Sequence, residues 1–218
     1  MPRRRPASSR YRRARSLVDP AIAGLVLFLV SPFLLIAATF IAADGGPVFF
    51  RHQRLGKDAK PFFVIKLRTM IPNADAYLDA NGIPTRRRTT RVGRVLRYTS
   101  IDELPQLINI IRGEMALIGP RPILPAMLTY MTERERERFT VLPGITGLAQ
   151  IKGRNLLCWS RRLKFDVIYA HAMSFRLDLY IILHTILFVV SGRGIAADSN
   201  RDEVDDVSIR PAFGSPAE

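Results

Sequence analysis

The residues best suited to chemistry are two adjacent carboxylates, Asp102 and Glu103, with arginines on both sides. Arg97 precedes the pair, and Arg121 follows it within the sequence Gly-Pro-Arg-Pro. A guanidinium suits phosphate because its planar fork binds two oxygens at once. A carboxylate among arginines is expected to have a lowered pKa and to be ionised, so it can attack phosphorus or bind magnesium. Attack on phosphorus would give an acyl phosphate and divide one transfer into two steps.

Each of these features also has a structural interpretation. Adjacent acids at the start of a helix complement the helix dipole, and taken alone the pair reads more readily as a capping device. The prolines around Arg121 stiffen a loop, so this side chain could be a fixed phosphate clamp or merely an exposed arginine. Further positive charge comes from Lys66 and Arg68.

The elements that must position these residues are predicted to be mostly helices with one small β-hairpin, an α+β fold. Val48–Phe50 and Phe62–Leu67 are rich in aromatic and β-branched residues, and Gly, Lys and Asp lie between them. This pattern predicts two short strands joined by a turn. Lys66 would then lie in the second strand of a basic hairpin, with Arg68 at its end.

A helical stretch is predicted to begin at Arg91 and to end before Gly113. Ser100 and Glu103 have the spacing of a capping box, so Ser100 is the expected N-cap of the helix that carries the carboxylates. Other expected elements are a helix over residues 126–139, a strand over 148–153, and helices over Trp159–Ala172 and Leu177–Val190. The last is short for a membrane span, which favours interfacial or core packing.

A membrane anchor is predicted near the start of the chain. No residue from Pro20 to Ala43 is charged, and a helix over this segment would be roughly 36 Å long, enough to cross a bilayer. Ser31-Pro32 lies in the middle, where proline removes a hydrogen bond and kinks the helix. The Ser31 hydroxyl could bond a backbone carbonyl at this break.

Both flanks of the anchor are basic, which favours the cytoplasmic side for each of them. A bent helix that enters and leaves on one side satisfies both flanks, whereas a straight span violates one. We therefore expect a re-entrant membrane helix and a catalytic domain on the cytoplasmic face. The expected organisation is a basic disordered arm over 1–15, the re-entrant helix over 16–43, the catalytic domain over 44–192 and an acidic disordered tail over 193–218.

The composition restricts the class of protein further. The net charge of +14 in 218 residues attracts polyanions such as nucleic acid, anionic lipid or phosphorylated substrates. The single cysteine, Cys158, can form neither an intramolecular disulfide nor a thiolate metal site. The three histidines are scattered without metal-ligand spacing, so a histidine-based zinc enzyme is not expected.

Three strings carry a family resemblance: GPVFFRHQRLGKDAKPFFVIKLRTM, GRVLRYTSIDELPQLINIIRGEMALIGPRP and PGITGLAQIKGRN. They resemble the bacterial sugar transferase family, in particular the small monotopic polyprenyl-phosphate glycosyl-1-phosphate transferases. The resemblance extends over about residues 15 to 190. The carboxylate block and the Gly-Pro-Arg-Pro block, in this order and spacing, are its most specific part.

The resemblance implies an activity and a set of site residues. Asp102 and Glu103 would be the catalytic dyad and would hold Mg²⁺, and Asp102 would attack the β-phosphate of a UDP-sugar and release UMP. Polyprenyl phosphate, such as undecaprenyl phosphate, would then take the sugar phosphate in the first membrane step of glycan or exopolysaccharide assembly. The helix break falls on Ser31 and Pro32. The implied substrate-binding residues are Lys66, Arg68, Arg97, Arg121, Asp166 and Asp178.

The resemblance also implies a bacterial inner-membrane location, with the lipid bilayer as a partner and no nucleic acid. The oligomeric state stays open, a homodimer included. One alternative is a membrane-tethered basic protein that binds nucleic acid or lipid without catalysis. Another is a glycosyl transferase that moves only the sugar and releases UDP rather than UMP.

Overall fold

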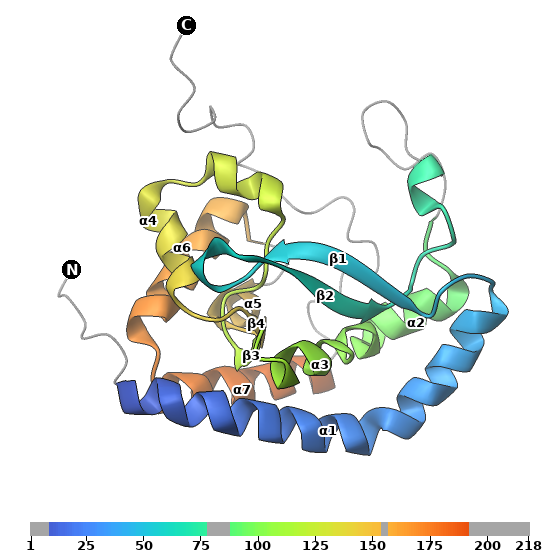
Figure 1. Cartoon of the computed structure of the whole chain (residues 1–218), viewed down its shortest axis with the longest axis horizontal. Helices are drawn as coiled ribbons and strands as arrows, with labels where there is room; N and C mark the ends of the chain where they lie inside the picture. Colours follow the sequence, from blue (N-terminus) through green and yellow to red (C-terminus); the bar gives the residue numbers. More distant parts are fainter. Residues whose placement is uncertain (1–8, 78–87, 154–156, 192–218) are drawn as a thin grey trace, which may run out of the picture.

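The structure, a computed structural model, describes residues 9–77, 88–153 and 157–191. Its longest element is α1, Ser9–Ala43, which lies along one side of the other elements and curves in its C-terminal part (Figure 1). Ala23, Ala37 and Ile41 are buried against the rest of the chain. Large apolar side chains cover the outer face of the helix and are exposed: Leu17, Val18, Ile22, Leu25, Phe28, Leu29, Phe33, Leu35, Ile36 and Phe40.

The helix continues through Ser31 and Pro32 without breaking into two, and its C-terminal part is curved (Figure 1). Pro32 has no N–H to give to the carbonyl of Phe28, one turn earlier. The Ser31 hydroxyl donates to that carbonyl at 2.8 Å, as predicted for a settled kink. In the part of the chain that the structure describes, α1 is the one helix long and apolar enough to cross a membrane, judged by length and composition.

Residues 9–15, predicted to be disordered, form the first two turns of α1. Arg15 explains this difference, because its guanidinium pairs with Asp19 at 2.9 Å and with Asp178 at 3.1 Å. It also donates to the carbonyl of Ile118 at 2.7 Å. A sequence rich in arginine resembles a solvated arm until buried partners from distant segments are known. Residues 1–8 and the predicted acidic tail over 193–218 lie outside the described residues.

The predicted hairpin is confirmed. β1, Phe49–Leu55, pairs antiparallel with β2, Pro61–Leu67, and the turn between them contains the 3₁₀ segment η1, Lys57–Ala59. A second, parallel pair joins β3, Ala116–Ile118, to β4, Gly144–Thr146. The fold is a mostly helical α+β arrangement with two small sheets, in agreement with the predicted class.

The helical stretch that carries the carboxylates is divided into three elements: α2, Arg91–Thr99; η3, Ile101–Glu103; and α3, Gln106–Ile111. Ser100 directly precedes η3, as predicted, but the expected capping box is not formed, because its side chain makes no cap hydrogen bond. Ser100 adopts a left-handed conformation with φ 59°, and its N–H bonds the Arg97 carbonyl, so it ends α2. The residue of this stretch that does form a side-chain N-cap is Thr90, at the start of α2, whose hydroxyl accepts a hydrogen bond from Gly93 N–H at 2.8 Å.

The remaining helical elements are η2, Ala74–Tyr77; η4, Pro125–Tyr130; α4, Glu133–Arg136; η5, Glu137–Thr140; α5, Leu148–Gly153; α6, Trp159–Ala172; and α7, Phe175–Ser191. The helix expected over 126–139 is interrupted at Met131, which is extended. The strand expected over 148–153 is wrong, because this segment is α5. Short apolar runs do not distinguish a strand from one buried turn of helix.

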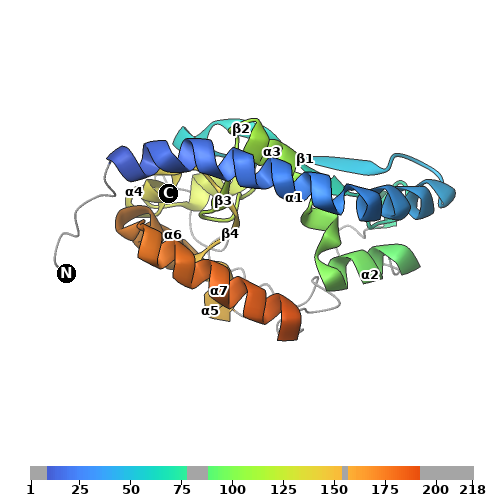
Figure 2. The ribbon, with the colours of Figure 1, turned by 90° about the horizontal axis from the view of Figure 1, so that it is seen from below.

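Helices α1 and α7 pack on the rest of the molecule through separate hydrophobic cores. In Figure 2, α1 and α7 lie on the same side of the molecule and diverge from the end where α1 begins. The core between α1, the hairpin and α3 contains Ala23, Val64, Leu107, Ile110 and Met115. A second core joins the β3–β4 sheet to α5, α6 and α7. α3 therefore packs on α1 on one side and on β2 on the other.

Gly93 holds α2 against the segment after β2. A Cβ at this position would lie 2.0 Å from the carbonyl oxygen of Thr69, so Gly93→Ala must displace the helix. We expect Gly93→Ala to destabilise the protein by roughly 2 kcal/mol or more. Gly24→Ala in α1 is the matched control, because a Cβ there meets nothing within 4 Å and alanine favours a helix. Thermal unfolding of the solubilised variants tests this, and equal midpoints would contradict it.

Candidate active site

The left-handed turn at Ser100 separates α2 from α3 and places Asp102 and Glu103 on the short η3 segment between them. Asp102 is 9% exposed, so its carboxylate is largely removed from water. No described residue donates a hydrogen bond to it. The Asp102 carboxylate is therefore buried without serving as a hydrogen-bond acceptor that stabilises the described part of the fold.

Glu103 is bound by two cations from different elements. Lys66 Nζ, from β2, lies 2.7 Å from Glu103 Oε1. Arg121, from the Gly-Pro-Arg-Pro loop after β3, donates from Nη2 to Oε1 at 2.5 Å and from Nη1 to Oε2 at 3.2 Å. The Arg121 side chain is 47% exposed, so a ligand can still reach it. The structure therefore brings together Asp102, Glu103, Lys66 and Arg121.

The two carboxylates have opposite pKa shifts. Burial, together with the neighbouring charge of Glu103, raises the pKa of Asp102 to about 6, against the pull of Lys66, Arg97 and Arg121. This corrects the expectation that arginines would lower it. Burial would also raise the pKa of Glu103, but Arg121 and Lys66 outweigh it and hold that pKa well below its usual range. Glu103 is the permanently ionised member, and Asp102 titrates close to neutrality.

Arg97 and Arg68 have different places. Arg97 lies close enough for its charge to lower the pKa of Asp102, and its Nε donates to the Thr69 hydroxyl at 2.9 Å. Arg68 is buried and donates to the carbonyls of Gly45 and Ile41 at 2.5 and 2.8 Å. It therefore caps the C-terminal end of α1 and is not brought to the dyad.

Asp166 and Asp178 are likewise not brought to the dyad. Asp166 is 3% exposed and pairs with Arg138. Asp178 is 4% exposed and accepts hydrogen bonds from Tyr11 and Tyr169, next to Arg15. Burial raises the pKa of each, and the paired arginine opposes that shift. In this structure both aspartates join elements of the fold.

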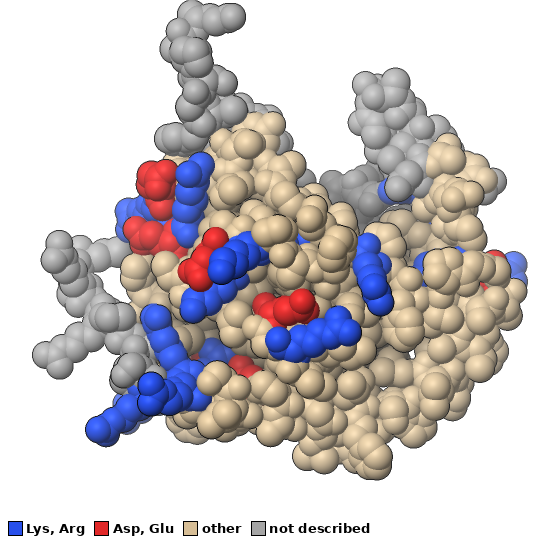
Figure 3. Space-filling model, viewed as in Figure 1, with Lys and Arg blue, Asp and Glu red and all other residues tan. Residues whose placement is uncertain are grey.

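Basic and apolar side chains lie on different parts of the surface. Figure 3 shows basic side chains gathered at the N-terminal end of α1, whereas the long surface of this helix toward the right carries almost none. The basic residues at that end include Arg10, Arg12 and Arg13. α7 adds a second apolar face, with exposed Phe175, Leu179, Leu183, Ile186 and Leu187.

Comparison with known proteins identifies the family. The model of the family described as "Bacterial sugar transferase" matches residues 10–192. The chain belongs to the bacterial sugar transferase family. Among its relatives is the uncharacterized sugar transferase EpsL of Bacillus subtilis, 41% identical over 182 residues, with 83% of this chain and 89% of the relative covered.

Two further relatives of this sugar transferase have more informative names. The exopolysaccharide production protein ExoY of Rhizobium meliloti is 40% identical, with 83% of this chain and 87% of the relative covered. The UDP-glucose:undecaprenyl-phosphate glucose-1-phosphate transferase of Caulobacter vibrioides is also 40% identical, with 79% of this chain and 68% of the relative covered.

The dyad of this sugar transferase can be tested for its fit to magnesium. Mg²⁺ prefers oxygen ligands and is usually held by one or two carboxylates together with substrate phosphates and water. Among the described residues, no group of three or more His, Cys, Asp and Glu could hold a metal ion by itself. Asp102 fits a magnesium ion shared with phosphate oxygens of a substrate. Glu103 could join through Oε2, which accepts one hydrogen bond, from Arg121, whereas Oε1 already accepts from both Lys66 and Arg121.

Sequence reasoning missed Asn109, a fully buried residue of α3. Its Oδ1 accepts from Ile65 N–H at 3.1 Å, and its Nδ2 donates to the Phe63 carbonyl at 2.8 Å. The amide thus takes the place of a neighbouring strand at the free edge of β2, and Glu114 accepts its second N–H at 2.7 Å. Asn109 therefore fixes the position of β2, and with it the position of Lys66, relative to Asp102 and Glu103. The available signal was an asparagine inside the apolar run of α3.

Asn109→Ala is expected to destabilise the protein by about 3 kcal/mol, because it leaves buried backbone groups of β2 unpaired at roughly 1–3 kcal/mol each. Arg112→Ala, at an exposed position just after the same helix, is the control with an expected change near zero. Chemical or thermal unfolding measures both. Equal stability of the two variants would remove Asn109 from this role.

Proposed function

We propose that this chain transfers a sugar 1-phosphate from a UDP-sugar to undecaprenyl phosphate and releases UMP, in the first membrane step of exopolysaccharide or related glycan assembly. The observation that carries the proposal is the buried Asp102 carboxylate next to Glu103, whose two cations come from separate elements. The names of relatives support it, since two are a UDP-glucose:undecaprenyl-phosphate glucose-1-phosphate transferase and an undecaprenyl-phosphate galactose phosphotransferase.

The chemistry proceeds in two displacements at one phosphorus. A carboxylate oxygen of Asp102 attacks the β-phosphorus of the donor, and the bond from that phosphorus to the bridging oxygen breaks. UMP leaves with the electron pair, and Asp102 holds the sugar phosphate as an acyl phosphate. A phosphate oxygen of the lipid acceptor then attacks the same phosphorus and releases the Asp102 carboxylate.

The surrounding residues supply alignment and charge rather than protons, as phosphoryl transfer requires. Arg121 is anchored at Glu103 and is half-exposed, so it can bind a donor phosphate oxygen. Lys66 lies on the other side of the same carboxylate, and Arg97 adds a third positive charge near Asp102. Magnesium, when bound, would neutralise further negative charge on the diphosphate.

Asp102 can act as a nucleophile at physiological pH. A carboxyl group with a pKa of about 6 is mostly ionised at pH 7.5. Its raised pKa means that it is a stronger base than an ordinary aspartate. Glu103 is fully ionised and cannot donate a proton, which favours a role in holding Lys66 and Arg121.

The membrane arrangement belongs to the same proposal. The apolar outer faces of α1 and α7 would lie in the bilayer, with the catalytic domain over 44–192 on the cytoplasmic face of the bacterial inner membrane. The bend at Pro32 would let residues 16–43 enter and leave on one side. The lipid acceptor could then reach Asp102 by diffusing within the bilayer.

The re-entrant arrangement predicts that both ends of the anchor are reached from the same side. Single cysteines at Ser8 and Asp58 in a Cys158→Ser background should both be labelled by an impermeant maleimide only when the cytoplasmic face is accessible. Inverted and right-side-out vesicles provide the comparison. Labelling from opposite sides would establish a full span instead.

UMP release tests the reaction. The detergent-solubilised protein is incubated with undecaprenyl phosphate, Mg²⁺ and a panel that begins with UDP-glucose and UDP-galactose, and the nucleotide product is identified. We expect UMP and a lipid-linked sugar diphosphate with at least one donor. UDP as the product would indicate a transferase that moves only the sugar, and no product with any donor, together with salt-sensitive nucleic-acid retention, would favour a binding protein.

A further inference from the structure

A buried ion pair lies behind the Gly-Pro-Arg-Pro loop. Arg138, on η5, is 2% exposed, and Asp166, on α6, is 3% exposed. Arg138 donates to the same oxygen of Asp166 from Nε at 3.1 Å and from Nη2 at 2.7 Å. Neither side chain is exposed enough to contact a substrate, so the pair needs another explanation.

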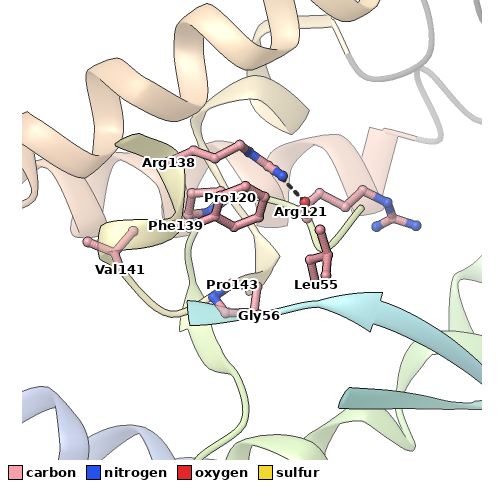
Figure 4. A pocket seen from close by; sticks show the side chains of 8 residues that line it. All are labelled: Leu55, Gly56, Pro120, Arg121, Arg138, Phe139, Val141 and Pro143. Carbon is pink, nitrogen blue, oxygen red and sulfur yellow. Dashed lines mark hydrogen bonds between the residues drawn. The ribbon is translucent and has the colours of Figure 1, made fainter. Parts of the chain in front are cut away.

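The second function of Arg138 Nη2 is a hydrogen bond to the backbone carbonyl of Arg121 at 2.5 Å. Figure 4 shows this bond beside a pocket between the end of β1, the Pro120-Arg121 segment and η5. In the same view the Arg121 side chain extends away from Arg138. Its far end is the guanidinium that binds Glu103. Arg138 therefore holds the backbone of Arg121, whose guanidinium lies against Glu103.

Backbone hydrogen bonds hold the loop on both sides of Arg121, and just after Pro122 the Ile123 carbonyl accepts from Leu55 N–H at 2.9 Å. Pro120 and Pro122 have no N–H, so the backbone between them can be held chiefly through its carbonyls. The Pro120 carbonyl accepts from Gly144 N–H at 3.0 Å, and Gly119 N–H donates to Thr146 at 2.8 Å. These bonds fix the loop up to Pro120, and Arg138 continues the attachment to Arg121 itself.

Stability alone does not account for the pair. A buried ion pair contributes little net stability, and replacing both members with apolar residues is often neutral or stabilising. What an apolar pair cannot supply is a directed donor for the Arg121 carbonyl. Asp166 fixes the guanidinium plane, so the remaining N–H of Nη2 points to that carbonyl.

We infer that Arg138 is a positioning residue for the transfer reaction: held by Asp166, it sets the backbone of Arg121 so that the Arg121 guanidinium meets Glu103 and the donor phosphate. The inference rests on the proposed function. It gives Asp166 a different role from direct substrate binding, because Asp166 acts through Arg138.

The first test separates positioning from folding. In Arg138→Met/Asp166→Leu no buried charge is left unpaired, so we expect the melting temperature to stay within a few degrees of the wild-type value. We expect kcat/KM for the UDP-sugar, measured as UMP release, to fall at least tenfold. Arg136→Gln/Glu133→Gln removes an exposed pair at 3.1 Å on the neighbouring α4 and is the control. Wild-type kcat/KM in the folded double variant would overturn the inference.

The second test asks whether the effect passes through Arg121. Arg121→Ala should itself lower kcat/KM at least tenfold. Adding Arg138→Met/Asp166→Leu to Arg121→Ala should then change kcat/KM less than twofold, because the positioned side chain is already gone. A further tenfold loss would show that the pair acts elsewhere and would overturn the inference.

A third readout does not depend on turnover. Hydrogen exchange, followed by mass spectrometry, should be faster for the peptide that contains Gly119 and Arg121 in the Arg138→Met/Asp166→Leu variant than in the wild type. Unchanged exchange would refute the positioning role even if the protein released no UMP. Absence of UMP from the wild type would refute the proposed function instead, so the two failures are distinguishable.

Discussion

Asp102→Asn is expected to abolish UMP release while making the folded protein more stable. The amide has nearly the same shape as the carboxyl group but cannot form an acyl phosphate, so turnover should fall at least a thousandfold. The pKa of Asp102 is raised from 3.8 to about 6 mainly by burial, which means that the ionised form is costly in the folded state. A neutral amide removes that cost.

The stability gain should depend on pH. Because the folded state holds the Asp102 proton more tightly than the unfolded chain, ionisation lowers wild-type stability progressively from about pH 4 to about pH 6. Asp102→Asn should therefore match the wild type below about pH 3 and exceed it by about 3 kcal/mol above pH 7. Thermal unfolding in EDTA, which excludes bound metal, measures this difference.

Asp44→Asn is the control for the aspartate-to-asparagine change, because Asp44 is exposed after α1. We expect wild-type turnover and a stability difference near zero. If Asp102→Asn retained substantial turnover, Asp102 would not be the nucleophile. If it destabilised the protein at pH 7.5, the carboxylate would be a structural group instead.

Glu103→Gln is expected to lower kcat at least a hundredfold with the protein still folded. The carboxylate accepts from Lys66 at 2.7 Å and from both terminal nitrogens of Arg121. A glutamine presents one oxygen and no charge, so it cannot hold both cations. Arg121 and Lys66 would then adopt positions that no longer match the donor diphosphate, and kcat should fall more than the affinity for the donor.

The same substitution should lower the pKa of Asp102, because the charge of Glu103 is one of the causes that raise it. The pH at which the stability gain of Asp102→Asn reaches half of its maximum should therefore move to a lower value in a Glu103→Gln background. Glu133→Gln, at a side chain that is 88% exposed, serves as the control. An unchanged midpoint would contradict the coupling between the two carboxylates.

The grouping of the carboxylates with Lys66 and Arg121 was predictable from the sequence, mainly through the family resemblance, whereas Arg68, Asp166 and Asp178 lie elsewhere. Spacing alone brought out the carboxylates and the Gly-Pro-Arg-Pro segment, and the structure places Arg121 against Glu103. Lys66 was expected in a strand beside them and lies there in β2. The direction of the Asp102 pKa was wrong, because burial outweighs the arginines and no residue count reveals burial.

Local patterns failed where tertiary contacts decide the outcome. Ser100 has the spacing of a capping box, but it adopts a left-handed conformation that ends α2 and makes no side-chain cap. Residues 148–153 have an apolar composition that fits a strand, yet they form α5 against α6 and α7. Residues 9–15 look like a solvated arm until Arg15 meets Asp178, far along the chain.

Positioning residues were the hardest to predict. Asn109 acts on β2, more than forty positions earlier in the chain, and Arg138 acts on Arg121 and Asp166, 17 and 28 positions away. Neither belongs to a motif with a chemical meaning of its own. A polar residue inside an apolar run was the only signal for Asn109, whereas Arg138 was concealed in an alternating charged run that is typical of a solvated helix face.

The covalent intermediate is the most direct test of the central claim. The wild-type protein is mixed with a UDP-sugar that supports turnover and with Mg²⁺ but without lipid acceptor, then quenched in acid and examined by intact-protein and peptide mass spectrometry. We expect a mass increase equal to one sugar phosphate on the peptide that contains Asp102, and its loss when undecaprenyl phosphate is added before the quench. An adduct on a different residue, or rapid UMP release with no adduct under these conditions, would contradict nucleophilic attack by Asp102.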